Sequence, residues 1–351
     1  MNELTERQKF LLTLVIHEYI RLAQPIGSQA LVERYKLDMS SATVRNELAA
    51  LDEMGYLRQP HTSAGRVPTE EGYRYFVSRL IRDTNLPEAT RSTISHQFYQ
   101  MREDVEQWVR LAASVLANQT RVASLVTSPH PEKAHFKHLE LISIRGRQVL
   151  MVMVMVGGEV HQRILTLAEP IAQEQLTRAA ARLTEKLQNC DSESIQSLRS
   201  QFDGLEADMI NWVLEEMTQS NAVVSGEVFI DGLSYVLAEP EFAGSEDARR
   251  ALHILEERPR LENFLSRSLP NNTVGGVQVL IGGESTLDEL RQFSVVLARY
   301  GAPGLATGML GVLGPMRMPY GRSISVVRFV SGLLSDLISE TLVDEQPDNL
   351  N

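Results

Sequence analysis

The stretch SSATVRNELAALDEMGYLRQPHTSAGRVPT, residues 40–69, decides how the amino-terminal part of this chain folds. Its first half predicts a helix that starts at a serine N-cap and ends near Gly55, the expected left-handed residue after the helix. Val44, Leu48 and Leu51 recur at helical spacing and fall within one narrow stripe. This stripe is expected to face neighbouring helices, which leaves the other side of the helix free for a partner.

That other side carries small and polar side chains with a single basic one. Bulky side chains would hold a helix away from the base edges of DNA, whereas these allow it to approach. Arginine can bond guanine, asparagine can bond adenine, and alanine can meet a thymine methyl. The helix residues expected to contact DNA are Ser41, Ala42, Thr43, Arg45, Asn46 and Ala49.

The second half of the stretch predicts a short hairpin. Residues 56–59 are expected to form a strand, residues 60–65 a loop without acidic side chains, and residues 66–68 the returning strand. A recognition helix followed by a basic hairpin, the wing, is how a winged helix-turn-helix holds DNA. The wing residues expected at the phosphates or the minor groove are Arg58, His61, Thr62, Ser63 and Arg66.

Two further helices are expected before this stretch. Thr5 and Gln8 fit a capping box at the start of the first, which runs to about residue 22. Residues 28–35 predict a short second helix, and a fourth helix is expected to start at Thr69. The polar segment that follows places the first domain boundary near residue 85.

The net charge of -11 is not shared evenly along the chain. Residues 1–85 hold 11 basic and 11 acidic residues, so residues 86–351 carry the whole excess. Attraction to phosphate is local, and an acidic body therefore does not exclude DNA binding. It predicts weak binding to nonspecific DNA.

Beyond residue 85 the pattern alternates between helices and strands. One long helix is expected at about 88–117, a mainly helical segment at 173–222, two short helices within 245–268, a helix at 287–300 and a closing helix at 323–342. Strands are expected at 122–127, 139–145, 149–156, 227–230, 277–281 and 308–318.

Other classes of function find little support. The longest apolar run, residues 149–156, is far shorter than a membrane span, and the amino terminus does not read as a secretory signal. The lone Cys190 fits a reducing cytoplasm. His130, His135 and His138 lack the spacing and partners of a metal site, so neither a metal nor another cofactor is expected. No nucleophile-base pair or paired carboxylate site is readable, and an enzyme is not expected.

Six motifs, collinear over the whole chain, resemble the heat-inducible transcription repressor family, HrcA. They are PIGSQAL (25–31), SSATVRN (40–46), PHTSAGRVPTEEGYRYFV (60–77), IGGES (281–285), FSVVLARY (293–300) and GMLGVLGPMRMPYGR (308–322). Residues 160–270 match only in general pattern. At Ser285 the family more often has asparagine.

The resemblance implies an α+β protein with an N-terminal winged helix-turn-helix and a GAF-like α+β domain that carries an inserted dimerisation domain. The corresponding boundaries are 1–85 for the winged helix, 86–120 for a linker helix, 121–159 and 271–342 for the GAF-like domain, and 160–270 for the insertion.

The resemblance also implies what the protein does. Family members repress heat-shock (chaperone) operons by binding double-stranded DNA at an inverted-repeat operator, CIRCE, as a homodimer. A GroEL-type chaperonin helps to keep the repressor active. The alternative is a metabolite-sensing transcription regulator that uses the GAF-like domain as a ligand switch.

Overall fold

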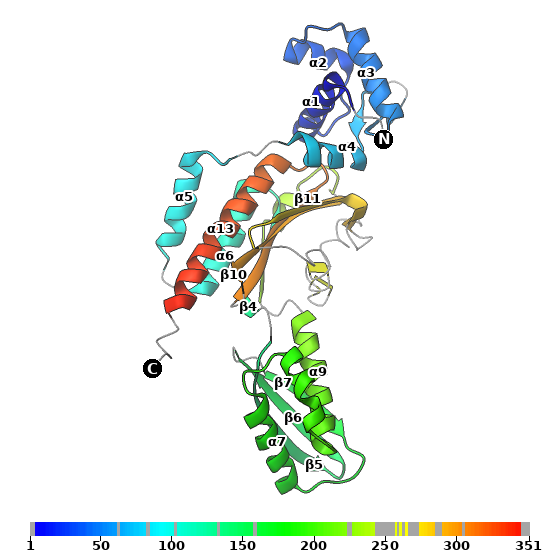
Figure 1. Ribbon diagram of the computed structural model, residues 1–351. Helices are drawn as coiled ribbons and strands as arrows, with labels where there is room; N and C mark the ends of the chain where they lie inside the picture. Colours follow the sequence, from blue (N-terminus) through cyan, green and yellow to red (C-terminus); the bar gives the residue numbers. More distant parts are fainter. Residues whose placement is uncertain are drawn as a thin grey trace. The chain divides into compact units, whose positions relative to one another are not determined.

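The computed structural model describes most of the chain as a mixed α+β structure (Figure 1). The described residues are 4–61, 64–81, 85–101, 104–131, 134–156, 160–222, 227–242, 257, 260–261, 264–265, 274–284, 290–303 and 306–344. Unit 1 comprises Met1–Pro129, Gly226–Ala302 and Gly308–Asn351, and unit 2 comprises His130–Ser225 and Pro303–Thr307. Within the described ranges, none of the helices is long and apolar enough to cross a membrane.

The amino-terminal part of unit 1, residues 4–81, is called the head below. Its elements are α1 (Glu6–Leu22), α2 (Ser28–Tyr35), α3 (Ser41–Glu53), β1 (Leu57–Arg58), β2 (Val67–Pro68), α4 (Glu70–Tyr75) and the π-helical turn η1 (Phe76–Leu80). The capping box of α1 is present, since the Thr5 hydroxyl accepts from the Gln8 backbone and the Gln8 side chain accepts from the Thr5 backbone. Ser40 caps α3 by accepting from Thr43 N.

The core of the head forms along the predicted stripe of α3. Val44 and Leu51 are fully buried and Leu48 is 3% exposed. They pack among α1 and α2, whose own buried side chains include Leu12 and Leu31. Burial of these aliphatic side chains fixes which face of α3 remains outside.

The rest of unit 1, called the body, contains an antiparallel sheet with the strand order β8-β3-β11-β10-β9 (Figure 1). Its strands are β3 (Ala123–Thr127), β8 (Val228–Asp231), β9 (Val277–Ile281), β10 (Phe293–Ala302) and β11 (Ala306–Pro315). The short β4 (His130–Pro131) and the two residues of β11 that it pairs with, Ala306 and Thr307, belong to unit 2. The helices are α5 (Glu88–Tyr99), α6 (Val105–Thr120), α10 (Leu233–Leu237) and α13 (Tyr320–Asp344), with the 3-10 turn η3 (Gly282–Glu284) after β9.

Two body helices cover the sheet. α6 packs on β3, α13 packs on β10, and the two helices also contact each other. Buried hydrogen bonds join the middle strands: the Tyr300 hydroxyl donates to Thr127 O, and Met309 N donates to the Thr127 hydroxyl. Burial raises the pKa of the Tyr300 phenol far above its ordinary value. This hydroxyl therefore stays neutral and serves as a donor.

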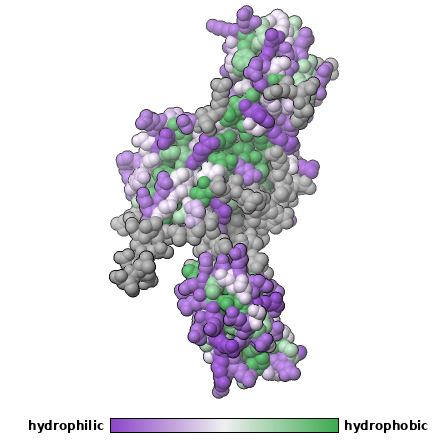
Figure 2. Space-filling model, in the orientation of Figure 1, coloured by the Kyte–Doolittle hydropathy of each residue, from purple (hydrophilic) through white to green (hydrophobic). Residues whose placement is uncertain are grey.

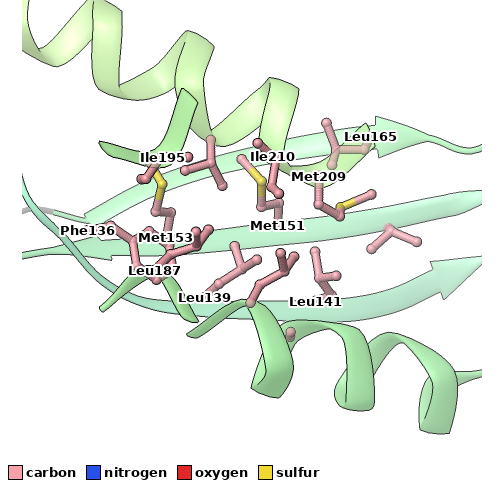
Figure 3. Close-up of a cluster of buried hydrophobic side chains, with 14 of the residues drawn as sticks. Phe136, Leu139, Leu141, Met151, Met153, Leu165, Leu187, Ile195, Met209 and Ile210 are labelled. Carbon is pink, nitrogen blue, oxygen red and sulfur yellow. The ribbon is translucent and has the colours of Figure 1, made fainter. Parts of the chain in front are cut away.

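Unit 2 contains a three-stranded antiparallel sheet of order β5-β6-β7, covered on one face by helices. Its elements are β5 (Phe136–Arg145), β6 (Gln148–Met155), β7 (Val160–Thr166), α7 (Gln173–Leu187), α8 (Ser192–Leu198), η2 (Arg199–Gln201) and α9 (Leu205–Ala222). Alternate residues of β6, such as Met151 and Met153, point into the core beside Leu139 and Leu141 of β5 and Ile210 of α9 (Figure 3).

This pairing corrects the expected course of the sheet. Residues 139–145 and 149–156 were expected in the GAF-like domain, 121–159, with the insertion at 160–270. Instead β5 and β6 pair with β7, and the compact unit begins at His130. The tight turn at Gly146, with φ 58°, favours pairing between sequence neighbours over pairing with distant β3.

Two expected helices also differ from the structure. The helix predicted at 88–117 is two helices, because Asp104 caps α6 by accepting from Glu106 N and Gln107 N. The linker predicted at 86–120 therefore includes α6, which packs into the body. The prediction of a helix at 287–300 is wrong for the residues from 293 onward, which form β10. This strand is buried on both faces, so apolar and polar residues do not alternate in its sequence. Most of the segment at 245–268 lies outside the described residues.

Candidate nucleic-acid interface

The outward face of α3 carries the residues predicted to contact DNA. Ala42, Arg45 and Asn46 are exposed. Ser41, Thr43 and Ala49 are half-exposed at the margins of the same face. The structure thus brings all six predicted helix residues to one surface of small and polar side chains.

Contacts on the inner side hold α3 in place. Arg7 on α1 lies 3.3 Å from Glu47 on α3. Both side chains are partly exposed, so this ion pair stabilises the packing of α3 by only about 0–1 kcal/mol. The buried aliphatic stripe therefore contributes most of the free energy that keeps α3 in position. The two exposed polar residues of the face, Arg45 and Asn46, are therefore carried by a helix whose position is set by the core.

α2 is anchored to α1 by a buried carboxylate. Glu18 is 5% exposed and accepts from Tyr35 at 2.8 Å and from Arg21 at 2.9 Å, and Arg34 lies 3.0 Å away. Burial raises the pKa of Glu18, but the hydrogen bonds and charges of these neighbours outweigh burial, and the net pKa lies below its ordinary value. Glu18 is thus ionised near neutral pH and keeps α2 beside α1.

The segment predicted to be the wing is a minimal antiparallel hairpin in the structure, and it is called the wing below. Leu57 pairs with Pro68 and Arg58 with Val67. Across the loop, Ala64 N donates to His61 O at 2.8 Å. Arg58 and His61 are exposed, as a DNA contact requires. Two other predicted wing residues, Thr62 and Ser63, lie outside the described residues.

Arg66 differs from the other predicted basic residues. Its side chain is 16% exposed, and its Nε lies 2.9 Å from the Asp52 carboxylate on α3. In contrast, neither Arg45 nor Arg58 has a carboxylate within ion-pair distance among the described residues. The sequence predicted all three arginines as DNA contacts, Arg45 on the helix and Arg58 and Arg66 in the wing, whereas the structure, in the parts of the chain that it describes, pairs Arg66 alone of the three with a carboxylate of the head.

A surface hollow of about 500 Å³ lies between α3, the wing and the start of α2. Its lining brings Arg45 and Arg66 together with Gln59 and adds two residues that the sequence reasoning missed, Ser28 and Gln29. The sequence feature that could have pointed to these two residues is Gly27, the N-cap of α2. Glycine has no side chain to accept hydrogen bonds from the first backbone N–H groups of the helix, which therefore stay available to a partner. Such free N–H groups favour anions at a helix start.

The histidines considered for a metal site lie near the start of unit 2. His138 lies 3.0 Å from Glu140 on its own strand, while His130 is on β4 and His135 precedes β5. Among the residues that the structure describes, no group of three or more His, Cys, Asp or Glu side chains is arranged to hold a metal ion.

Comparison with known proteins identifies the class of protein to which the chain is similar. Residues 106–324 match the family model described as the HrcA protein C terminal domain. The heat-inducible transcription repressor HrcA of Roseiflexus castenholzii is 44% identical over 347 residues, covering 97% of this chain and 96% of the relative. That of Chloroflexus aurantiacus is 40% identical over 365 residues, covering 99% and 97%. These relatives are transcription repressors, a non-enzymatic class.

The chain belongs to the HrcA family of heat-inducible transcription repressors. A crystal structure of a hypothetical protein is similar to the whole chain, with a TM-score of 0.61, 24% identity, and coverage of 97% of this chain and 100% of the other. At that identity the likeness concerns the fold alone.

Proposed function

We propose that the protein represses heat-shock (chaperone) operons and that its head, residues 4–81, is a winged helix-turn-helix that reads DNA. The observation that carries the proposal is the two-sided character of α3. Its aliphatic stripe is buried, while Arg45 and Asn46 are exposed among small side chains. A helix of this shape fits the major groove, and these two residues are suited to guanine and adenine.

The remaining contacts in the proposal follow the DNA backbone. Ser41 and Thr43 lie at the amino-terminal end of α3, where backbone N–H groups and hydroxyls suit a phosphate. Arg58 and His61 extend from the wing. Because phosphate contacts set register and base contacts set sequence, α3 would choose the site and the wing would hold the head on it.

We further propose that the DNA site is an inverted repeat of the CIRCE type, read by two heads of a homodimer. A two-fold dimer matches a palindromic site because each head meets the same half-site sequence. The charge balance of residues 1–85 gives one head little general attraction to DNA. Linking two heads raises affinity through effective concentration.

The surface proposed for dimerisation is the open face of the unit 2 sheet, opposite α7 and α9. Ile142, Leu150 and Ile164 lie opposite one another across its three strands, and Val154 lies opposite Val160. Ile142 is 46%, Val160 52% and Ile164 61% exposed. Figure 2 shows hydrophobic residues interrupting the hydrophilic surface of unit 2.

An antiparallel sheet with one face in water normally presents polar side chains on that face. An aliphatic row there marks an interface, and the two-sheet packing of a second copy would cover it with the same row. This supports assigning the inserted dimerisation domain to unit 2, with the insertion beginning at His130 and not at residue 160.

Three further parts of the proposal follow from the family. The body would be the GAF-like domain, and a GroEL-type chaperonin would maintain the active repressor in the cytoplasm. The strand β6 supports a need for such help. It buries Met151, Met153 and Met155 on one side and carries Leu150, Val152 and Val154 on the other, so an incompletely folded chain would expose an unbroken apolar run, residues 149–155.

Footprinting tests the function directly. Purified full-length protein would be titrated onto the DNA upstream of the chaperonin operon of its own genome. Two protected half-sites related by inverted symmetry, lost when the repeat is scrambled at constant composition, are expected. Equal protection of the scrambled fragment would overturn the proposal.

A further inference from the structure

The base of the wing is held to the rest of the head through Arg66. The Arg66 backbone forms an isolated antiparallel bridge with Ile26, in which each N–H donates to the carbonyl of the other at 2.9 Å. Ile26 lies directly before Gly27, the N-cap of α2. The wing is thereby joined to the turn that leads into α2.

The side chain of Arg66 adds a second attachment, to α3. Its Nε lies 2.9 Å from Oδ2 of Asp52, with the two side chains 16% and 30% exposed. The Arg66 Nε is buried and not aligned with an acceptor as in a regular hydrogen bond, so the attraction is mainly one of charge. Asp52 lies in the last turn of α3, where the partial negative charge of the helix end also favours a cation.

Close backbone packing leaves little freedom at this junction. A Cβ built on Gly65 would lie 2.3 Å from the carbonyl carbon and 2.4 Å from the carbonyl oxygen of Ile26. The chain therefore reaches Ile26 only with glycine at this position. Arg66 is fixed from the side of α2 by its backbone and from the side of α3 by its guanidinium.

We propose that the Asp52–Arg66 pair determines how selective the head is for its DNA site, with Arg66 acting as a positioning residue that orients the wing on α3. The inference rests on the proposed function. The pair does two things. It sets the angle between the wing and the recognition helix, and it neutralises a cation that would otherwise attract any DNA backbone.

Neutralising Arg66 affects the binding of nonspecific DNA, which a purely structural contact between the wing and α3 would not do. A cation paired within the head releases few counterions on binding, whereas a free one adds about one phosphate contact, which raises sequence-independent affinity roughly fivefold to tenfold at moderate salt. Removing the Asp52 carboxylate while keeping its shape would free Arg66. Binding to nonspecific DNA would then strengthen, and the ratio of specific to nonspecific affinity would fall.

The test uses full-length protein and two probes, an inverted-repeat fragment taken from the footprint and the same bases scrambled. For Asp52→Asn we expect scrambled DNA to bind about fivefold more tightly, the salt dependence on that probe to steepen, and the affinity ratio to fall by about fivefold or more. Glu53→Gln is the matched control. Glu53 is exposed beside Asp52, and its loss removes the same charge without freeing an arginine. Its affinity ratio should stay unchanged.

The charge-reversed pair keeps the test decisive if Asp52→Asn proves unstable. Asp52→Arg combined with Arg66→Asp should recover at least half of the wild-type ratio on a logarithmic scale, while either change alone should not. If Asp52→Asn shifts both probes by the same factor, as Glu53→Gln is expected to do, the inference is wrong. If the wild-type protein itself does not prefer the inverted repeat over the scrambled probe, the proposed function is wrong, independently of the Asp52–Arg66 pair.

Discussion

The phenol of Tyr35, at the end of α2, donates a hydrogen bond of 2.8 Å to the buried carboxylate of Glu18 in the C-terminal half of α1. Together with Arg21 and Arg34, it keeps the pKa of Glu18 below its ordinary value of 4.5 despite burial. The anchoring of α2 therefore depends on an ionised group, which ties the stability of the head to pH.

The first prediction concerns this carboxylate. A folded-state pKa below the unfolded value means that Glu18 stabilises the head above about pH 4.5 and that this contribution is lost as pH falls through the folded value. At pH 7, Glu18→Gln should cost about 1–3 kcal/mol, because it weakens hydrogen bonds to charged groups. The deficit against wild type should shrink on acidification. Hydrogen exchange of α1 and α2 peptides at matched pH would measure it, and a deficit that grows on acidification would contradict it.

The second prediction concerns base reading. Arg45→Ala should cost about 1–3 kcal/mol on the inverted repeat and relax the preference at the base pair that Arg45 meets. Arg79→Ala is the control, because Arg79 is an exposed arginine of the head away from α3. Gel-shift titrations on a set of single-base variants of the inverted repeat measure both the loss of affinity and the change in base preference. Unchanged affinity and unchanged preference would remove Arg45 from the proposed interface.

The third prediction concerns the open sheet face. Ile164→Lys places a charge in the aliphatic row and should convert the proposed dimer to a monomer, with operator affinity falling about a hundredfold. Gln175→Lys adds the same charge on α7, which lies on the covered side of the sheet, and should leave the dimer intact. Sedimentation velocity reports the mass. Two variants with identical dimer populations would argue against this interface.

The fourth prediction concerns the wing. Gly65→Ala requires the chain to move away from the Ile26 carbonyl and should reduce operator affinity by roughly tenfold or more, since each 1.4 kcal/mol is tenfold. Gly332→Ala on α13 is the control, because its added Cβ also meets nothing within 4 Å and the position lies outside the head. Thermal unfolding of unit 2 should be unaffected in both. Wild-type affinity in Gly65→Ala would show that the wing angle does not matter.

The features of the head that depend on neighbours in sequence could be predicted. The capping box at Thr5, the serine cap of α3 and the buried stripe of Val44, Leu48 and Leu51 all rest on contacts within one or two turns. Local hydrogen bonds and helical periodicity depend on residues close together in the chain, so the sequence predicts them directly. The exposed face of α3 followed from the same pattern.

Partners distant in sequence could not be predicted in the same way. The pairing of Arg66 with Asp52 depends on how the wing folds back, and residues 66 and 52 share no periodic relation. β10 is buried on both faces, and its continuous apolar sequence does not distinguish strand from helix. The sheet to which residues 139–156 belong depends on a choice between near and distant partners, which short-range patterns leave open.

The even balance of charge in residues 1–85 has a consequence for how sharply the proposed target genes would respond. A single head has little general attraction to DNA, so the proposed repressor would hold its operator only as a dimer, and operator occupancy would follow the square of the subunit concentration while dimers are scarce. Losing two thirds of the competent subunits would cut occupancy about ninefold. A brief shortage would thus open the operon, and a modest recovery would close it.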